Sequence, residues 1–129
     1  MARDLDGLSS TFLGRGEYEE AEALQREAIR LHRELGDEPT PEFSAVLNNL
    51  ALTMDAKGDF EETEALYRRS LAIDRELYGD EHPNVATTIS NLGLLLADAR
   101  GREASEPFIR EALAIRRKVL AITRTPHTA

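Results

Sequence analysis

Apolar residues recur along this chain at intervals of three and four, which is the spacing of one face of an α-helix. The clearest stretch is 41–57, where Leu47, Leu50 and Met54 follow that spacing. The same pattern returns in two further stretches. These are residues 2–14, with Leu5, Leu8 and Phe12, and residues 83–99, with Ile89, Leu92 and Leu96. The pattern predicts three helices of one kind, each with an apolar face that other parts of the chain must cover.

A second kind of helix is predicted after each of the first. These helices cover residues 17–35, 60–78 and 103–122. Each carries its own apolar stripe at helical spacing. The stripes are Leu24, Ile29, Leu31 and Leu35, then Leu66, Leu71, Ile73 and Leu77, then Phe108, Leu113, Ile115 and Val119. The order of elements is therefore three helical hairpins.

Prolines and glycines mark the ends of these helices. Pro41 and Pro83 each open a helix, since the first-turn N–H that proline lacks has no partner within a helix. Gly16 and Gly58 lie in the turns inside the hairpins, where a left-handed backbone is often needed.

The third hairpin departs from this pattern. Its glycine, Gly101, is displaced by one residue, and Arg102 stands where the other turns have an aromatic residue. Pro107 falls inside the expected helix, and proline is best tolerated in a first helical turn. We therefore expect a longer turn at 99–105 and a helix that starts late, near Ser105.

The chain repeats itself when it is shifted by 42 residues. Residues 16–24 then fall on 58–66, and residues 47–51 fall on 89–93. Small residues recur where two helices of a hairpin would approach closely. They are Ser9, Ala51 and Gly93 on the first helices and Ala21, Thr63 and Ser105 on the second. No hairpin can bury its own stripe, so stacking of hairpins must supply the core.

The order Leu-x-Asn-Leu-Ala at 47–51, the glycine, aromatic and glutamates of 58–66, and the late His82-Pro83 resemble the tetratricopeptide repeat. The 42-residue period and the His-Pro pair resemble the kinesin light chain subtype in particular. The resemblance implies an all-α fold, a right-handed α-solenoid of three helix-turn-helix hairpins with about six helices. It also implies a single domain over 1–129. The repeats would be residues 1–40, 41–82 and 83–124, followed by a tail at 125–129.

In the resembling family, the first helices line a concave groove that receives an extended peptide or a partner helix. The family's groove positions fall on Arg3, Asp6, Ser10, Asn48, Asn49, Leu52, Asp55, Ser90, Asn91, Leu94 and Asp98. Asn49 and Asn91 are the most useful, because an amide can bond to both polar groups of a bound backbone. The alternative is that both only bond neighbouring helices.

The charge of these positions indicates the kind of ligand. Some family members clamp a terminal carboxylate with Lys and Arg, but Asp55 and Asp98 stand in the groove of this chain. We therefore expect a neutral or basic protein segment with apolar anchors for Leu52 and Leu94. The resemblance implies a protein-protein interaction module.

The composition of the chain narrows the kinds of partner and binding site that we expect. The formal net charge of −8 argues against a nucleic-acid partner. No apolar run approaches the ~18 residues of a membrane span, so we expect no membrane partner. The chain has no cysteine, which excludes disulfides and thiolate metal sites. A cytoplasmic location is the simplest interpretation.

No catalytic motif is present, so we expect no enzyme, no cofactor and no metal site. His32 is expected to be exposed, and one histidine beside two acids at His82 is weak evidence for a metal. Most acids have an arginine one turn on. Such pairs are Glu22 with Arg26, Glu64 with Arg68, and Glu106 with Arg110.

A structural assembly element is the alternative function. Thr125-Pro126 resembles the opening of a fourth repeat, which suggests a longer array or an end without a capping helix. Apolar residues on the last helix, such as Phe108, Ile109 or Ile122, would then contact another copy. Light scattering over a concentration series separates this homo-oligomer from a monomeric binding module.

Overall fold

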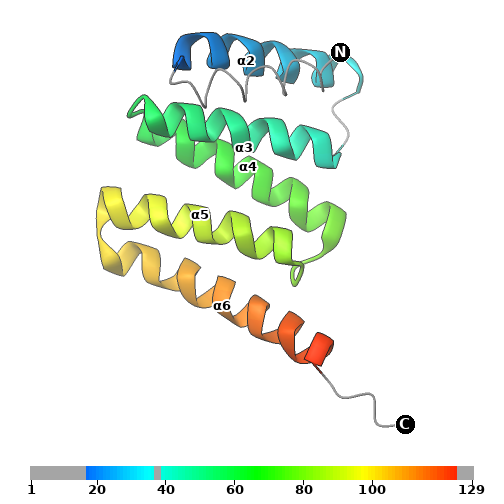
Figure 1. Cartoon of the computed structure of the whole chain (residues 1–129), viewed down its shortest axis with the longest axis vertical. Helices are drawn as coiled ribbons and strands as arrows, with labels where there is room; N and C mark the ends of the chain where they lie inside the picture. Colours follow the sequence, from blue (N-terminus) through cyan, green and yellow to red (C-terminus); the bar gives the residue numbers. More distant parts are fainter. Residues whose placement is uncertain (1–16, 37–38, 125–129) are drawn as a thin grey trace. The chain divides into compact units, whose positions relative to one another are not determined.

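The computed structural model describes residues 17–36 and 39–124, and all regular structure in these ranges is helical (Figure 1). The helices are α2 (Tyr18–Glu34), α3 (Pro41–Ala56), α4 (Phe60–Tyr78), α5 (Pro83–Arg100) and α6 (Arg102–Arg124). Their bounds agree with the periodicity to within two residues, and the predicted all-α repeat fold is confirmed. The helix expected at 2–14 lies outside the described residues. No helix in the described ranges is long and apolar enough to cross a membrane.

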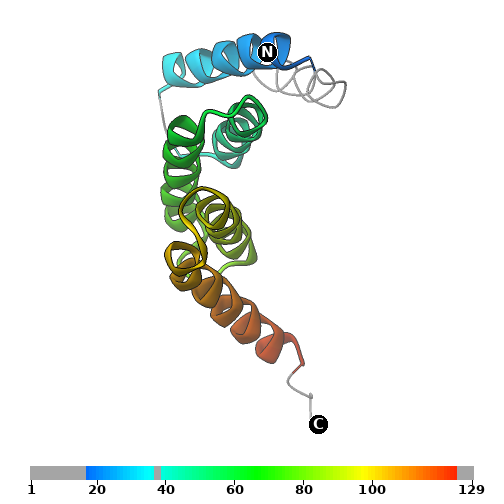
Figure 2. The same cartoon turned by 90° about the vertical axis from the view of Figure 1, so that its left-hand side faces the viewer.

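The chain divides into two compact units, residues 1–73 and 74–129. In the first unit α2 runs antiparallel to α3 and packs against it (Figure 1). In the second unit α5 and α6 form an antiparallel hairpin, and the 23-residue α6 continues past the start of the 18-residue α5 (Figure 2).

Ile122, near the end of α6, is 75% exposed. Self-association through this end stays a prediction.

The core of the first unit is built around α3. Its predicted positions Leu47, Leu50 and Met54 are at most 3% exposed. Phe43 and Val46 are buried with them. Helix α2 supplies Ala28 and Ile29 to this core, and α4 adds the partly buried Leu66 and Ile73. Because α3 is covered from both neighbours, it anchors the unit.

The predicted helix starts are confirmed in detail. Thr40 Oγ1 accepts a hydrogen bond of 3.0 Å from the backbone N–H of Phe43, and Pro41 takes the first helical position. The ring nitrogen Nδ1 of His82 accepts from the backbone N–H of Asn84, also at 3.0 Å. A side-chain cap of this kind stabilises a helix by ~1 kcal/mol. In both helices the side chain directly before the predicted proline fixes the helix start.

Gly58 has φ +85°, as the turn inside the second hairpin requires, whereas Gly16 lies outside the described residues. The expected looser turn at 99–105 is wrong. A single residue, Gly101, joins α5 to α6 with φ +89°, and Pro107 lies inside α6. Gly101 closes the turn by itself, so the helix starts at Arg102 rather than near Ser105 and accommodates the proline within its first two turns.

The apolar stripes predicted for the second helices are only partly right. Leu35 is 83% exposed and Leu113 is 44% exposed. Buried polar residues link neighbouring helices instead. Thr53 Oγ1 donates to Gln25 Oε1 at 2.8 Å, and the hydroxyls of Ser44 and Ser70 lie 2.7 Å apart. These hydroxyls and the carbonyl oxygen of Gln25 satisfy one another's hydrogen bonds away from water, whereas Nε2 of Gln25 is buried without a partner among the described residues.

His32 is not exposed as expected. It is half-buried on α2, and its ring stacks on Phe43 with 5.3 Å between the ring centroids. The corresponding residue on α4, Asp74, is 5% exposed and accepts a hydrogen bond from Thr88 Oγ1. A charged residue at the equivalent position of another repeat was therefore not a sign that His32 is exposed.

The predicted pairs of acids with arginines one turn on all form in the structure. Glu22 has a second partner, because Lys57 Nζ at the end of α3 lies 2.6 Å from its carboxylate. Lys57 first, and Arg26 second, hold the pKa of Glu22 below its ordinary value. These contacts tie α2 to the end of α3.

This arrangement predicts an acid-sensitive contribution to stability. The pKa of Glu22 is lower in the folded chain, so its stabilisation is present above the unfolded value near 4.5 and disappears as pH falls through the folded value. Glu22→Gln should lower the free energy of unfolding by roughly 0.5–1 kcal/mol at pH 7, and this loss should disappear as the pH falls through the folded pKa of Glu22. Urea titrations over a series of pH values measure this. Glu76→Gln, on an exposed residue of α4, is the control, and an equal loss at every pH would contradict the assignment.

Candidate protein-binding faces

Helix α3 exposes one side in the first unit. Asn48 and Asn49 are half-buried there, Leu52 is 46% exposed and Asp55 is exposed. Their spacing places them on one face of the helix, away from the buried positions that form the core. The four predicted residues of this helix thus share one accessible surface, which we name the α3 face.

Helix α5 repeats the arrangement in the second unit. Ser90 and Asn91 are half-buried, Leu94 is 62% exposed and Asp98 is exposed. These residues form the α5 face. Each face presents a large apolar side chain one helical turn after an asparagine. Arg3, Asp6 and Ser10, the remaining predicted residues, lie outside the described part of the chain.

Asn48 carries an unsatisfied polar atom. Its Oδ1 is buried and has no hydrogen-bond partner among the described residues. A buried acceptor without a donor costs about 1–3 kcal/mol.

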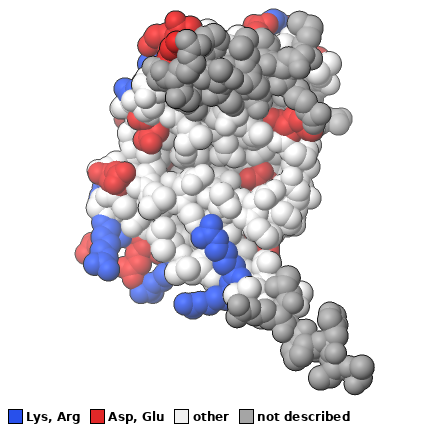
Figure 3. Space-filling view, viewed as in Figure 1, with Lys and Arg blue, Asp and Glu red and all other residues white. Residues whose placement is uncertain are grey.

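The charge on the two faces is negative. Asp55 is the acid of the α3 face, and it influences the pKa of Tyr67 on α4. Burial chiefly, and the Asp55 carboxylate in addition, raise the pKa of the Tyr67 phenol. On the side of the molecule seen in Figure 3, Lys and Arg side chains gather along α6, while the surface over α5 has few charged atoms. Neither face offers a cation for an acidic ligand.

His82 caps the backbone of α5. Its Nδ1 is the cap of α5, and its ring stacks on Tyr78 with 4.4 Å between centroids. Across residues 17–36 and 39–124, no three acidic or histidine side chains gather where they could hold a metal ion.

A surface that sequence reasoning missed lies on the other side of α3. Arg26, Arg30 and Arg33 of α2 and Arg69 of α4 line a pocket in the first unit. The intervals of four and three between the α2 arginines were the available signal, because such spacing places three guanidinium groups on one helix face.

Comparison with known proteins identifies the repeat. A tetratricopeptide repeat family model matches residues 42–118, and a second model of the same description matches residues 5–35. No curated protein matches the sequence.

Several solved structures share this fold. BtubC (BKLC) from P. vanneervenii superposes with a TM-score of 0.84 at 25% identity, over 99% of this chain and 51% of that one. Repeats of a putative kinesin light chain from Podosopora anserina give 0.79 at 21% identity, over 98% and 58%. The TPR domain of Arabidopsis FLU gives 0.78 at 19% identity, over 91% and 95%.

The chain thus spans little more than half of the first two of these structures. The 42-residue period, the capped helix starts and the small residues at helix contacts all agree with the match to the family model. The chain belongs to the tetratricopeptide repeat family, and its repeats resemble those of kinesin light chains.

Proposed function

We propose that this chain is a non-catalytic module that binds neutral or basic protein segments, through the α3 face in its first unit and through the α5 face in its second. Tetratricopeptide repeats generally mediate protein-protein interaction and are typically scaffolds rather than enzymes. The observation that carries the proposal is the exposure of leucine at equivalent positions of two repeats, Leu52 at 46% and Leu94 at 62%.

Each leucine is an apolar anchor. Covering a large apolar side chain contributes about 1.5–3 kcal/mol when it is fully exposed beforehand, so a half-exposed leucine contributes a share of that. Isolated exposed leucines are common on protein surfaces. Their recurrence at the same repeat position, one turn after Asn49 and Asn91, favours a contact surface over chance exposure.

The asparagines and acids add selectivity. An amide donates and accepts, so it can bond a peptide backbone without requiring a particular side chain. Asp55 and Asp98 would repel an acidic segment and attract a basic one. The proposed ligand is therefore an extended segment with apolar side chains and a neutral or positive charge.

The test uses the full chain and a phage-displayed library of random 12-residue peptides. Peptides that are enriched are synthesised, and their affinity is measured by calorimetry. Leu52→Ala with Leu94→Ala should weaken binding by about ten-fold or more. The matched control is Leu113→Ala, on a residue of α6 that is 44% exposed, and it should change affinity by less than about two-fold.

The companion variant removes the amides. Asn49→Ala with Asn91→Ala should weaken the same peptides by several-fold, roughly one hydrogen bond at each site. Circular dichroism checks that the helices persist. Equal affinity in the leucine variant and the parent, or a library from which only acidic peptides emerge, would overturn the assignment of these faces.

A further inference from the structure

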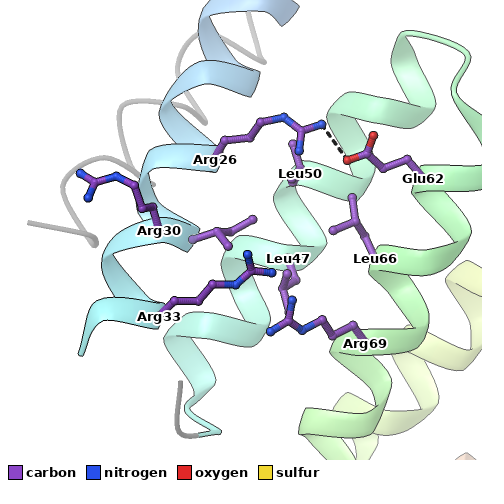
Figure 4. Close-up of a pocket in the computed structure, with 9 residues that line it drawn as sticks. Arg26, Arg30, Arg33, Leu47, Leu50, Glu62, Leu66 and Arg69 are labelled. Carbon is purple, nitrogen blue, oxygen red and sulfur yellow. Dashed lines mark hydrogen bonds and ion pairs between the residues drawn. The ribbon is translucent and has the colours of Figure 1, made fainter. Parts of the chain in front are cut away.

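Helix α2 shows how a second helix of this repeat is covered by a helix of the first kind. Gln25, Ile29 and His32 lie on successive turns of one side of α2. Helix α3 packs on this side, and Ile29 is 8% exposed in the core that it forms with Leu47 and Leu50. Figure 4 shows these two leucines of α3 between α2 and α4. The first unit thus shows what kind of helix fits this side.

The same side of α6 is open to solvent. A shift of two repeat periods carries the three residues of α2 onto Ile109, Leu113 and Arg116, which we name the α6 face. Leu113 is 44% exposed, whereas Ile29 of α2 and Leu71 of α4, at the same repeat position, are 8% and 6% exposed. Leu120, two turns after Leu113 on the same side, is 48% exposed. An apolar side that is buried on two helices is therefore uncovered on the third.

The charged pair beside this face is uncovered in the same way. On α2, Glu22 pairs with Arg26, and Lys57 at the end of α3 lies 2.6 Å from the same carboxylate. The equivalent pair on α6 is Glu106 with Arg110. The side chains of the α2 pair are 21% and 46% exposed, and those of the α6 pair are 48% and 76% exposed. Both differences have the sign that removing a covering helix would produce.

No described helix of the first kind is free to cover the α6 face. Leu47 and Leu50 of α3, which pack on α2, are at most 1% exposed, and Ile89 and Leu92 of α5 are fully buried. A second copy of the chain could offer α3 or α5 only by opening its own core. In the ranges 17–36 and 39–124, the chain therefore does not provide the cover.

We propose that the α6 face docks an amphipathic helix of a partner protein, which lies antiparallel to α6 as α3 lies antiparallel to α2. Its apolar residues recur at intervals of three and four and cover Ile109 and Leu113, in the mode by which amphipathic helices bind apolar surfaces. The α6 face lies on a different helix from the α3 and α5 faces, so this docking does not depend on the function proposed above.

One difference between α2 and α6 changes what the partner must offer. Gln25 of α2 accepts a hydrogen bond from Thr53 of α3. Ile109 takes this place on α6 and cannot accept a hydrogen bond, so an apolar side chain opposite it contributes more than a hydroxyl does. The partner helix therefore carries an apolar residue where α3 has Thr53.

The charges on α6 give the partner helix a direction. Glu106 lies near the start of α6, and Arg116 and Arg117 are exposed in its second half. An antiparallel partner begins beside these arginines and ends beside the glutamate. Acids in its first turn and a lysine at its end are favoured by these neighbours and by its own helix dipole. Helix α3 has this order, with Glu42 in its first turn and Lys57 at its end.

The probe is a synthetic peptide with the sequence of residues 40–57, in which Thr53→Leu provides the apolar residue and fluorescein is attached at the C-terminus. Anisotropy with the full chain should give a Kd below about 100 μM. The peptide that keeps Thr53 should bind about three-fold more weakly, and Leu50→Ala in the probe should weaken binding by about ten-fold. Absence of binding by the probe would overturn the proposal.

Variants of the chain locate the site. Leu113→Asp places a carboxylate under the docked helix and should weaken binding of the probe by about ten-fold or more. Leu94→Asp makes the same change at a 62% exposed leucine of α5 and should alter affinity by less than about two-fold. Thermal unfolding and circular dichroism check that both variants fold like the parent. Equal losses of affinity in the two variants would contradict the proposal.

A charge-swapped probe tests the direction of the docked helix. It carries Glu42→Lys and Lys57→Glu, keeps the net charge of the probe and should bind about five-fold more weakly. Arg116→Glu in the chain should weaken the original probe and strengthen the swapped one. An effect of the same sign on both probes would exclude the antiparallel arrangement.

A photo-leucine in place of Leu50 of the probe identifies the surface directly. Crosslinks should map to Leu113. Crosslinks to Ile29 would show that the probe replaces α3 in the first unit, and crosslinks to Leu52 or Leu94 would place it on the α3 or α5 face. Either of these results would overturn docking on the α6 face.

Sedimentation velocity of the chain without the probe tests the other possible occupant. The chain should sediment as a monomer at concentrations at which it binds the probe. A dimer that Leu113→Asp dissociates would assign the α6 face to a second copy and would overturn the proposal of a partner protein.

Discussion

Replacing Phe43 by alanine is expected to lower the free energy of unfolding by about 3–5 kcal/mol, the range for truncating a buried aromatic side chain. Phe43 is 2% exposed and lies in the core of the first unit. Its ring contacts the rings and charges of two helices, with His32 of α2 stacked on it and Arg69 of α4 over it. Truncation leaves a cavity and removes both contacts.

The effect should exceed that of aromatic truncation at the surface. Tyr18→Ala, at the 37% exposed start of α2, removes a ring of similar size and should cost below about 1 kcal/mol. Phe43→Leu retains most of the apolar volume and should fall between the two. The backbone N–H of Phe43 still donates to Thr40, so the helix start is retained in all variants.

Denaturant titrations followed by circular dichroism measure these differences. A loss below about 1.5 kcal/mol for Phe43→Ala would show that the unit does not depend on this ring for its packing.

The helices were predictable because their signals are local. A proline at the first position, a capping side chain before it and an apolar residue every three or four positions each act within a few residues. Helix α4 has no proline, but its apolar stripe alone predicted it at its observed bounds, Phe60–Tyr78. Gly58 has φ +85°, a conformation that costs other residues strain, so its role was also visible in the sequence.

Contacts between helices were less predictable, because hydrophobicity does not report what a side chain meets. Gln25 is fully buried, since Thr53 satisfies its carbonyl, while Leu35 near the end of the same segment is 83% exposed. His32 was misjudged for the same reason, since its cover is the ring of Phe43 on another helix.

The candidate faces and the pocket illustrate the same limit. The residues of the α3 and α5 faces were inferred through a family resemblance, and the structure places those that it describes on one side of each helix. The pocket could not be inferred in this way. Arg33 and Arg69 lie 36 positions apart in the sequence, and only the packing of α2 and α4 on α3 brings them to one rim.

Gly93 offers the sharpest test of how closely the helices of a repeat approach. A Cβ built on this residue of α5 would lie 2.7 Å from Ile109 Cδ1 and 3.3 Å from Phe108 Cβ, both on α6. The glycine is helical, so the restriction comes from the neighbouring helix and not from its own backbone. Gly93→Leu should therefore cost about 3 kcal/mol, the upper end of the usual range for overpacking.

Smaller changes separate crowding from helix propensity. Alanine favours a helix over glycine by about 1 kcal/mol, which opposes the clash in Gly93→Ala. Valine lacks the Cδ1 atom of isoleucine, so Ile109→Val removes the nearest contact. Gly93→Ala combined with Ile109→Val should accordingly be more stable than the sum of the two single variants, a positive coupling of about 1 kcal/mol in a double-mutant cycle.

Hydrogen exchange of the α5 and α6 amides measures the effect within the second unit, and thermal unfolding measures it for the chain. Ala99→Leu is the matched control, because Ala99 is exposed on the same helix and leucine should change its stability by less than about 0.5 kcal/mol. If Gly93→Leu were as well tolerated as Ala99→Leu, α5 and α6 could not pack as closely as the structure shows. If the effects of Gly93→Ala and Ile109→Val on stability were simply additive, Ile109 would move aside without cost when a Cβ is added at Gly93. Phe108 alone would then limit how closely α5 and α6 approach.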